Sequence, residues 1–108
     1  MIDVAYSDLA KNDLKRLRRR HAAYAAEVMR IVRDELRVDG CVSDAYHPHI
    51  LDNPDGRYSG YMEFHAFDDV LVLYYPPFPD GFVRVQRVCT HEELRTGRFG
   101  REWPAAVG

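Results

Sequence analysis

The sequence predicts an α+β fold, in which a mainly antiparallel sheet carries an N-terminal strand and a helical hairpin packed on one face. Three observations favour this class. Residues 2–6 alternate apolar and polar side chains, two amphipathic segments lie between residues 8 and 37, and three strand-like runs occupy the second half. The expected order is β-α-α-β-β-β, which leaves the other face of the sheet free to hold a site.

The first half of the chain is expected to form the first strand and both helices. Ser7 is a suitable N-cap for a helix over residues 8–20. A second helix is predicted over residues 22–37, where apolar side chains recur at intervals of three and four, and Asp39-Gly40 provides its end. The junction between the helices lacks Gly and Pro, so we expect a tight antiparallel hairpin. One face of the first helix is expected to carry Leu9, Ala10, Leu14 and Leu17.

The second half is expected to supply three strands after an irregular segment over residues 41–57. Strands are predicted over residues 58–66, 70–75 and 82–89, with Asp68-Asp69 as the first turn and the Pro-rich residues 76–81 as the next loop. The run over 70–75 is β-branched and aromatic, which is typical of a strand buried on both faces. Thr90 is expected to cap a short helical turn over residues 92–94.

Size and composition exclude several classes of protein. At 108 residues, the chain fits one domain over residues 1–97, followed by a peripheral tail over 98–108 in which Trp103 is expected to pack onto the body. The 46% of hydrophobic residues excludes a disordered chain. No apolar run approaches the ~20 residues of a membrane span, and the start does not resemble a signal peptide. Two cysteines cannot form a disulfide framework, so we expect a cytoplasmic protein without a membrane partner.

Charge is unevenly distributed behind the formal net charge of −2. Residues 1–38 hold nine basic and six acidic side chains, whereas the rest of the chain is acidic. Within residues 11–20, six basic side chains accompany only Asp13. Such a run indicates either a solvated helix face or a docking surface for phosphate groups. In the second case, the RNA-binding residues would be Lys11, Lys15, Arg18 and Arg19.

Histidines in the second half are the main candidates for chemistry. Hairpin pairing is expected to bring His65 and the turn at Asp69 close to His91, and paired imidazoles can supply a base and an acid near neutral pH. Each histidine has the alternative of a structural hydrogen-bonding role. His47 and His49 are not expected to bind a metal, because their loop contains Pro and lacks a nearby Cys.

Three residues of the last strand invite a functional interpretation. Arg84 and Arg87 interrupt an apolar strand, so they are expected to bind phosphate or a carboxylate. Their spacing of three predicts opposite faces of the sheet, which allows at most one of them to reach a site. Cys89 is expected to pack as a small hydrophobe rather than act as a nucleophile.

Taken together, these segments resemble the RelE/YafQ family of bacterial type II toxins, closest to the YafQ branch. The resemblance extends over almost the whole chain and depends on the order and spacing of its pieces. Beyond the strand over 2–7 and the basic helix, the matching residues are His49-x-Leu51, Gly60-Tyr61, His65, Asp69, Leu71-Val72-Leu73-Tyr74, and Val83 to His91 with Leu94.

The resemblance implies a ribosome-dependent endoribonuclease that cleaves mRNA in the A site and is inhibited by a RelB/DinJ-like antitoxin. A ribose 2′-OH would attack the adjacent phosphate, without a cofactor. Carried over by position, the catalytic residues are His49, His65, Asp69 and His91, with Arg87 or Arg84 at the phosphate. In this assignment His49 or His65 is the base, oriented by Asp69, and His91 is the acid.

Some positions depart from the family pattern. Met62 replaces an arginine, and Val70 and Arg95 replace aromatic residues, so a weaker phosphate site and weaker base stacking are expected. Two alternatives therefore stay open. One is a catalytically degenerate homologue that only binds antitoxin or regulates, and the other is a nuclease that does not need the ribosome.

Overall fold

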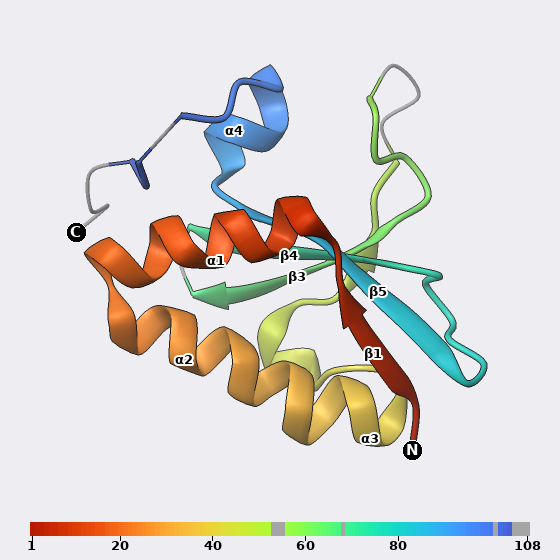
Figure 1. Ribbon diagram of the computed structural model, residues 1–108. Coiled ribbons are helices and arrows are strands. Elements are labelled where there is room, and N and C mark those ends of the chain that lie inside the picture. The colour runs from red at the N-terminus through yellow and green to blue at the C-terminus, as the bar shows by residue number, and fades with distance from the viewer. Residues whose placement is uncertain (53–55, 68, 101, 105–108) are drawn as a thin grey trace.

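The computed structural model describes residues 1–52, 56–67, 69–100 and 102–104, and it has the expected α+β class (Figure 1). Its elements in chain order are β1 (Asp3–Tyr6), α1 (Asp8–Arg20), α2 (Ala22–Ile31), the π-helical η1 (Val32–Leu36), α3 (Arg37–Asp39), the 3₁₀-helical η2 (Asp44–Tyr46), β2 (His49–Ile50), β3 (Met62–Phe67), β4 (Val70–Tyr75), β5 (Phe82–Cys89) and α4 (His91–Thr96).

The strands form one five-stranded sheet in the order β1-β5-β4-β3-β2. β1 runs parallel to β5, and every other neighbouring pair is antiparallel. A mainly antiparallel sheet is therefore confirmed, with one parallel pair. Between β1 and the remaining strands, the hairpin of α1 and α2 packs across one face of the sheet (Figure 1).

The helical hairpin forms as expected. The Ser7 hydroxyl accepts a hydrogen bond from the Ala10 amide at 3.0 Å, so it caps α1. A single residue, His21, separates α1 from α2, and the helical segment of α2, η1 and α3 ends before Gly40. Gly40 has a φ of +73°, a left-handed conformation that favours glycine at the end of this helical segment.

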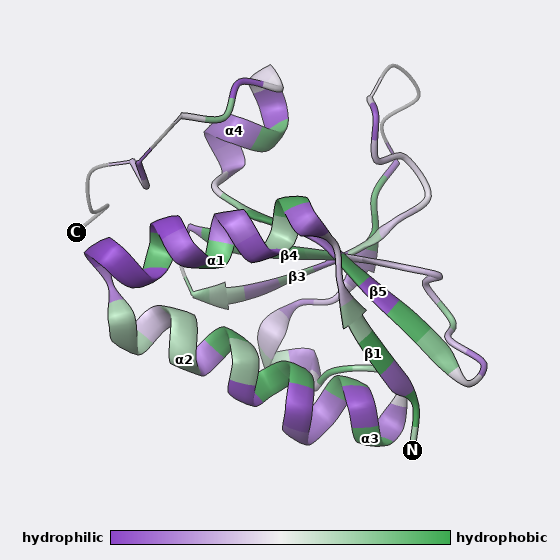
Figure 2. Ribbon diagram, in the orientation of Figure 1, coloured by the Kyte–Doolittle hydropathy of each residue, from purple (hydrophilic) through white to green (hydrophobic). Residues whose placement is uncertain are grey.

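The buried face of α1 differs from the expected one. Its buried residues are Ala10, Asp13, Arg16 and Leu17, whereas Leu9 is 44% exposed, so its expected place on the buried face is wrong. The helix is turned so that two charged side chains point inward, where they form internal ion pairs. Figure 2 shows that α1 is largely hydrophilic along its length, whereas α2 is more apolar.

The strands agree with the sequence in the last hairpin and differ before it. β4 and β5 have the expected bounds. β3 begins at Met62 instead of residue 58, because residues 58–61 form a turn in which the Tyr61 amide bonds to the Tyr58 carbonyl. β2 was not expected in the segment predicted to be irregular. In the expected turn Asp68-Asp69, residue 68 lies outside the described residues.

Two apolar layers pack on the sheet. The layer beneath the helices includes Phe64, Val72, Tyr74, Val85 and Val88. A smaller layer covers the opposite face, which we call the open face, and its buried residues are Tyr58, Leu71, Leu73 and Cys89. Alternate residues of β4 belong to the two layers, which confirms a strand buried on both faces.

Cys89 packs as the small hydrophobe that the sequence predicts. It is fully buried in the open-face layer. Burial raises the pKa of its thiol well above the usual range, so the sulfur stays protonated and is a poor nucleophile.

The segment after α4 is less peripheral than the sequence suggests. Trp103 is 4% exposed and belongs to the layer beneath the helices, which confirms its expected packing. Phe99 packs on the open-face layer. Each aromatic ring also lies over a buried guanidinium group, Phe99 on Arg87 and Trp103 on Arg16. The domain boundary at residue 97 stays a prediction.

Within the described parts of the chain, no helix combines the length and apolar character that crossing a bilayer requires.

Candidate active site

All four residues assigned to catalysis lie in one group at the end of the open face. β3 alternates, so that Phe64 packs under the helices while His65 reaches the open face. His49 comes from the neighbouring β2, Asp69 precedes β4, and His91 is the first residue of α4. The ring centroids of His49 and His65 are 6.1 Å apart, and those of His65 and His91 are 5.1 Å apart.

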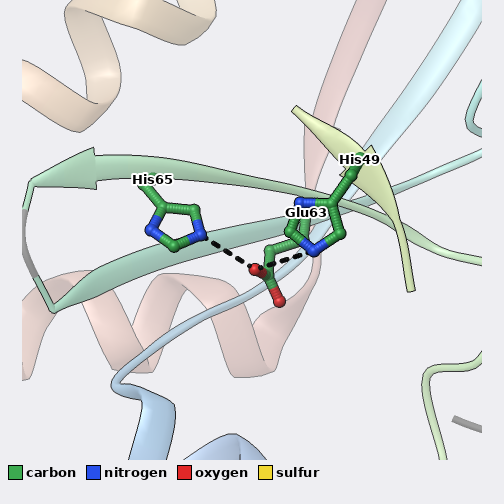
Figure 3. Close-up of side chains that lie close together, drawn as sticks. All are labelled: His49, Glu63 and His65. Atoms are coloured by element: carbon green, nitrogen blue, oxygen red, sulfur yellow. Dashed lines mark hydrogen bonds and ion pairs between the residues drawn. The ribbon is translucent and has the colours of Figure 1, made fainter. Parts of the chain in front are cut away.

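Glu63 joins this group although sequence reasoning did not select it. Its side chain is only 6% exposed, and its Oε1 lies 3.1 Å from Nε2 of His65 and 3.4 Å from Nε2 of His49 (Figure 3). The missed signal was the spacing Glu63-x-His65, which puts both side chains on one face of a strand.

The hydrogen bonds assign protons to the two histidines beside Glu63. A carboxylate only accepts, so Nε2 of His65 donates to it and Nδ1 of the neutral ring is left as a proton acceptor. The Nδ1 atom of His49 instead donates to the His47 carbonyl at 3.1 Å. His49 therefore donates to Glu63 as well only when its ring is protonated. Of the two, His65 is the better placed to accept a proton.

Asp69 orients His91, and this corrects its assignment to His49 or His65. Its Oδ1 accepts from Nδ1 of His91 at 2.6 Å and from the backbone amide of the same residue at 2.8 Å. Thr90 and Glu93 form a complete capping box at this helix start, which holds His91 in place. Nε2 of the half-exposed His91 ring faces away from the carboxylate and can exchange a proton with a substrate.

Arg84 and Arg87 lie on the same face of the sheet, contrary to the expectation of opposite faces. The register shifts on β5 between Val85 and Arg87, because Tyr74 of β4 pairs with Val85 while Leu73 pairs with Arg87. This bulge adds one residue to β5 between Arg84 and Arg87. The Arg87 side chain, three positions after Arg84, therefore points to the same face as Arg84. The sequence alone does not show a bulge, since the residue at this position, Gln86, is not a glycine.

Arg87 is closed off from a substrate. It is 6% exposed, and its Nε and Nη2 donate to the Asp13 carboxylate at 2.8 and 2.9 Å. The Phe99 ring centroid lies 3.5 Å from its guanidinium carbon. Burial alone lowers the pKa of Arg87, but hydrogen bonds to Asp13 and Tyr58 outweigh it and raise the pKa, so the group stays charged. Its assignment to a phosphate is wrong for this structure, whereas the expected ion pair is present.

Arg87 belongs to a buried network of four charges, which we call the closed network. Arg16 donates to Asp13 at 3.2 Å and to Glu93 of α4 at 3.0 Å. The second Asp13 oxygen also accepts from the Val88 amide at 3.0 Å. The closed network therefore joins α1, β5 and α4, and its formal charges cancel.

Two of the departures from the family pattern do not touch the open face. Met62 packs on the layer beneath the helices, and Val70 is buried there. Their effect on a phosphate site is therefore indirect. Arg95 is exposed on α4 and pairs with Glu92 at 2.7 Å.

The basic residues of α1 stand apart from the histidines. Lys11, Lys15, Arg18 and Arg19 are exposed on the helix that packs on the opposite face of the sheet. Within the described part of the chain, none of the four has an ion-pair partner. The run is therefore a free cationic surface, from which Arg16 is withdrawn.

One set of side chains has the spacing of a metal site. The available ligand atoms of His49, Glu63 and His65 all lie within 4.8 Å of one another. His47, the other histidine of the motif considered from sequence, is outside this set. Two imidazoles and a carboxylate suit Zn²⁺ and other late first-row divalent ions.

Fold and site together define a class: a small α+β protein with an acid–base cluster on the open face of its sheet. The family model of the bacterial toxin of type II toxin-antitoxin systems, YafQ, matches residues 2–96. The chain therefore belongs to the YafQ toxin family. No curated protein sequence matches it.

Solved structures share the fold. The toxin in the E. coli DinJ-YafQ toxin-antitoxin complex is 25% identical, with a TM-score of 0.64 over 86% of this chain and 96% of its own. A metal-bound toxin from Helicobacter pylori is 21% identical, with a TM-score of 0.69 over 87% and 99% of the chains. YoeB from Staphylococcus aureus, solved as a dimer, is 13% identical, with a TM-score of 0.64 over 83% and 97%.

Proposed function

We propose that this YafQ-family toxin is an endoribonuclease that cleaves mRNA on the ribosome. The observation that carries the proposal is the pair of imidazoles, His65 and His91, with ring centroids 5.1 Å apart and a separate carboxylate for each. This spacing allows one phosphodiester to contact both rings, and the separate carboxylates let one ring act as base while the other acts as acid.

The proposed reaction is an intramolecular transfer at phosphorus. Nδ1 of His65 takes the proton of a ribose 2′-OH, and O2′ bonds to the adjacent phosphorus as the bond from phosphorus to O5′ breaks. Nε2 of protonated His91 gives its proton to O5′, and Asp69 compensates the charge of that ring. The products are a 2′,3′-cyclic phosphate and a 5′-OH. His49 is assigned to hold Glu63 in place.

The ribosome has two roles in this proposal. It presents the mRNA, and its RNA binds the free cations Lys11, Lys15, Arg18 and Arg19. Because Arg87 is committed to Asp13, the site depends on other groups to neutralise the charge that develops on the phosphate. The basic surface of α1 supports contact with polyanions, since five of the six basic residues between positions 11 and 20 are exposed.

An antitoxin partner is the second part of the proposal. The E. coli relative is described as a DinJ-YafQ toxin-antitoxin complex. In this chain, a groove of about 680 Å³ runs between α1 and α2, with Leu14 and Met29 in its lining and Lys11, Lys15 and Arg18 along it. An acidic amphipathic helix of a RelB/DinJ-like antitoxin would match both its apolar and its charged lining.

The test is cleavage of mRNA on purified ribosomes, with the product ends identified chemically. We expect His65→Ala and His91→Ala each to lower the rate by about 10²- to 10⁴-fold. His21→Ala, on the helical hairpin, is the matched control and should leave the rate unchanged. Full activity of both site variants would contradict the mechanism. Harmless expression with intact antitoxin binding would favour the degenerate alternative, and cleavage of naked RNA would favour the ribosome-independent one.

We also propose metal binding as a second function of the same face, because His49, Glu63 and His65 have suitable spacing. One relative is described as a metal-bound toxin. A divalent ion on these three residues would occupy the proposed base, so we expect it to inhibit cleavage. Calorimetry with Zn²⁺ should show binding that Glu63→Gln removes and His21→Ala leaves intact. Equal binding by both variants would rule this set out.

A further inference from the structure

The far end of the open face carries exposed aromatic rings and a free cation. We define the aromatic platform as Tyr61, Tyr75, Phe82 and Arg84. Tyr61 and Tyr75 have ring centroids 5.0 Å apart, and the guanidinium carbon of Arg84 lies 6.0 Å from the Phe82 centroid. Tyr75 is 51% exposed and Phe82 is 46% exposed. We propose that the platform stacks bases of the RNA strand whose phosphate is held at His65 and His91.

The register places the platform on the same face as the candidate active site. Glu63 pairs with Leu73 across the hairpin. Tyr61 lies two residues before Glu63, and Tyr75 lies two residues after Leu73, so both rings return to the face of this pair. Tyr61 packs on the open-face layer, and its ring contacts Tyr75.

The bulge in β5 brings Arg84 to the platform. Arg84 pairs with Tyr75 in the register. Its neighbours Val83 and Val85 are buried beneath the helices, so the Arg84 side chain points to the open face. Without the bulge, one of the two arginines would face the helices. With the bulge both lie on the open face, where Arg87 joins the closed network through Asp13 and Arg84 stays exposed.

The platform lies a few nucleotides from the histidines. Tyr61 directly precedes β3 and lies four positions before His65, which corresponds to ~13 Å at ~3.3 Å per residue. The open-face layer, with Leu73 in the same row as Glu63, connects the two ends. A single RNA strand bound at the histidines can therefore continue along this face and reach the rings.

The chemistry favours RNA over a protein segment as the occupant. Aromatic rings stack on any base, and a nearby guanidinium attracts the phosphate backbone and stacks as well. Arg84 has no carboxylate partner among the residues that the structure describes, so its charge is available. The platform is also continuous with the proposed cleavage site, whereas the groove that suits an antitoxin helix lies between α1 and α2. The inference rests on the proposed function, because it names a contact of the same substrate.

The test is binding of a six-nucleotide RNA whose 2′-OH groups are methylated, which prevents cleavage. In NMR titrations of the labelled full-length protein, we expect ring signals of Tyr61, Tyr75 and Phe82 and the Nε–H signal of Arg84 to shift. Tyr75→Ala and Arg84→Ala should each weaken binding by about tenfold. Tyr24→Ala on α2 and Arg33→Ala on η1 are the matched controls, and they should change affinity by less than about twofold.

Several outcomes would overturn the platform. They are the absence of RNA binding, shifts at the histidines without shifts at the rings, or shifts at the rings caused by purified antitoxin and not by RNA. The last outcome would assign the rings to a protein partner. The proposed function is tested by a separate assay, which measures ribosome-dependent cleavage of mRNA. If mRNA is cleaved but the ring signals do not shift, only the platform proposal is contradicted. If the ring signals shift but mRNA is not cleaved, only the nuclease proposal is contradicted.

Discussion

The closed network and the active-site cluster both combine carboxylates with basic side chains, but the first stabilises the fold and the second is open to a substrate. In the closed network, Asp13, Arg16, Arg87 and Glu93 are all less than 10% exposed, and each charge meets at least one opposite charge. In the cluster, by contrast, His49 and His91 are half exposed. Glu63 alone serves the rings of both His49 and His65. Complete internal pairing joins elements together, whereas incomplete pairing leaves nitrogen atoms for a substrate.

Removal of the shared carboxylate of the closed network should have the largest effect on stability. Asp13→Ala leaves two buried guanidinium groups short of a partner, and we expect a loss of about 3–5 kcal/mol in the free energy of unfolding. Urea denaturation of the wild type and the variant measures this loss of unfolding free energy. Asp34→Ala removes an exposed carboxylate that pairs with Arg33, and it should leave the midpoint almost unchanged. An equal loss of stability in both variants would show that the buried ion pairs of the closed network stabilise the fold no more than an exposed pair does.

Trp103→Ala tests whether the segment after α4 helps to seal the closed network. The ring is 4% exposed and lies 5.3 Å from the guanidinium carbon of Arg16, so its loss removes apolar packing and admits water to a buried ion pair. We expect a loss of about 3 kcal/mol. The control is Phe78→Ala, since Phe78 is 76% exposed. A stability loss no larger than that of the control would return the tail to the peripheral role that the sequence predicts.

Glu63→Gln should separate catalysis from stability. Glutamine keeps the shape and can accept one hydrogen bond, but it cannot balance the charge of a protonated ring. We expect the cleavage rate to fall by about 10- to 100-fold, with a small change in unfolding free energy. The two assays are run on the same preparation. A large stability loss with normal cleavage would make Glu63 part of a structural network like that of Asp13.

Tyr74 offers the smallest and the most pH-dependent effect. Its hydroxyl is buried and has no hydrogen-bond partner among the described residues. Tyr74→Phe should therefore raise stability by about 0–1 kcal/mol at neutral pH.

The gain from Tyr74→Phe should grow in alkali. Burial raises the pKa of Tyr74 from 10.0 to about 12, so the unfolded chain loses this proton first as pH increases. Between about pH 10 and 12 this group therefore favours unfolding of the wild type, and the variant lacks this contribution. Unfolding curves from pH 8 to 11 for both proteins measure the difference. A gain that does not change with pH would show that the hydroxyl is solvated.

Much of the architecture follows from local sequence. The apolar runs of β4 and β5, the cap at Ser7 and the stop at Gly40 each act over a few residues, so they can be identified without tertiary contacts. Hairpin pairing already singled out His65, Asp69 and His91, the resemblance gave the full set with His49, and the fold brings all four together. Their roles in catalysis stay predictions.

Only the tertiary structure decided which charges are free. The sequence placed Arg16 in a basic run and assigned Arg87 to phosphate, yet both are neutralised by carboxylates, most of them far along the chain. Three features explain which charges are paired. They are the rotation of α1, the bulge in β5, and the contacts of Glu63 with His49 of β2 and His65 of β3. The alternation of residues determines which face a side chain prefers, but only the packing of distant elements determines which opposite charge it meets, and therefore whether it stabilises the fold or binds a substrate.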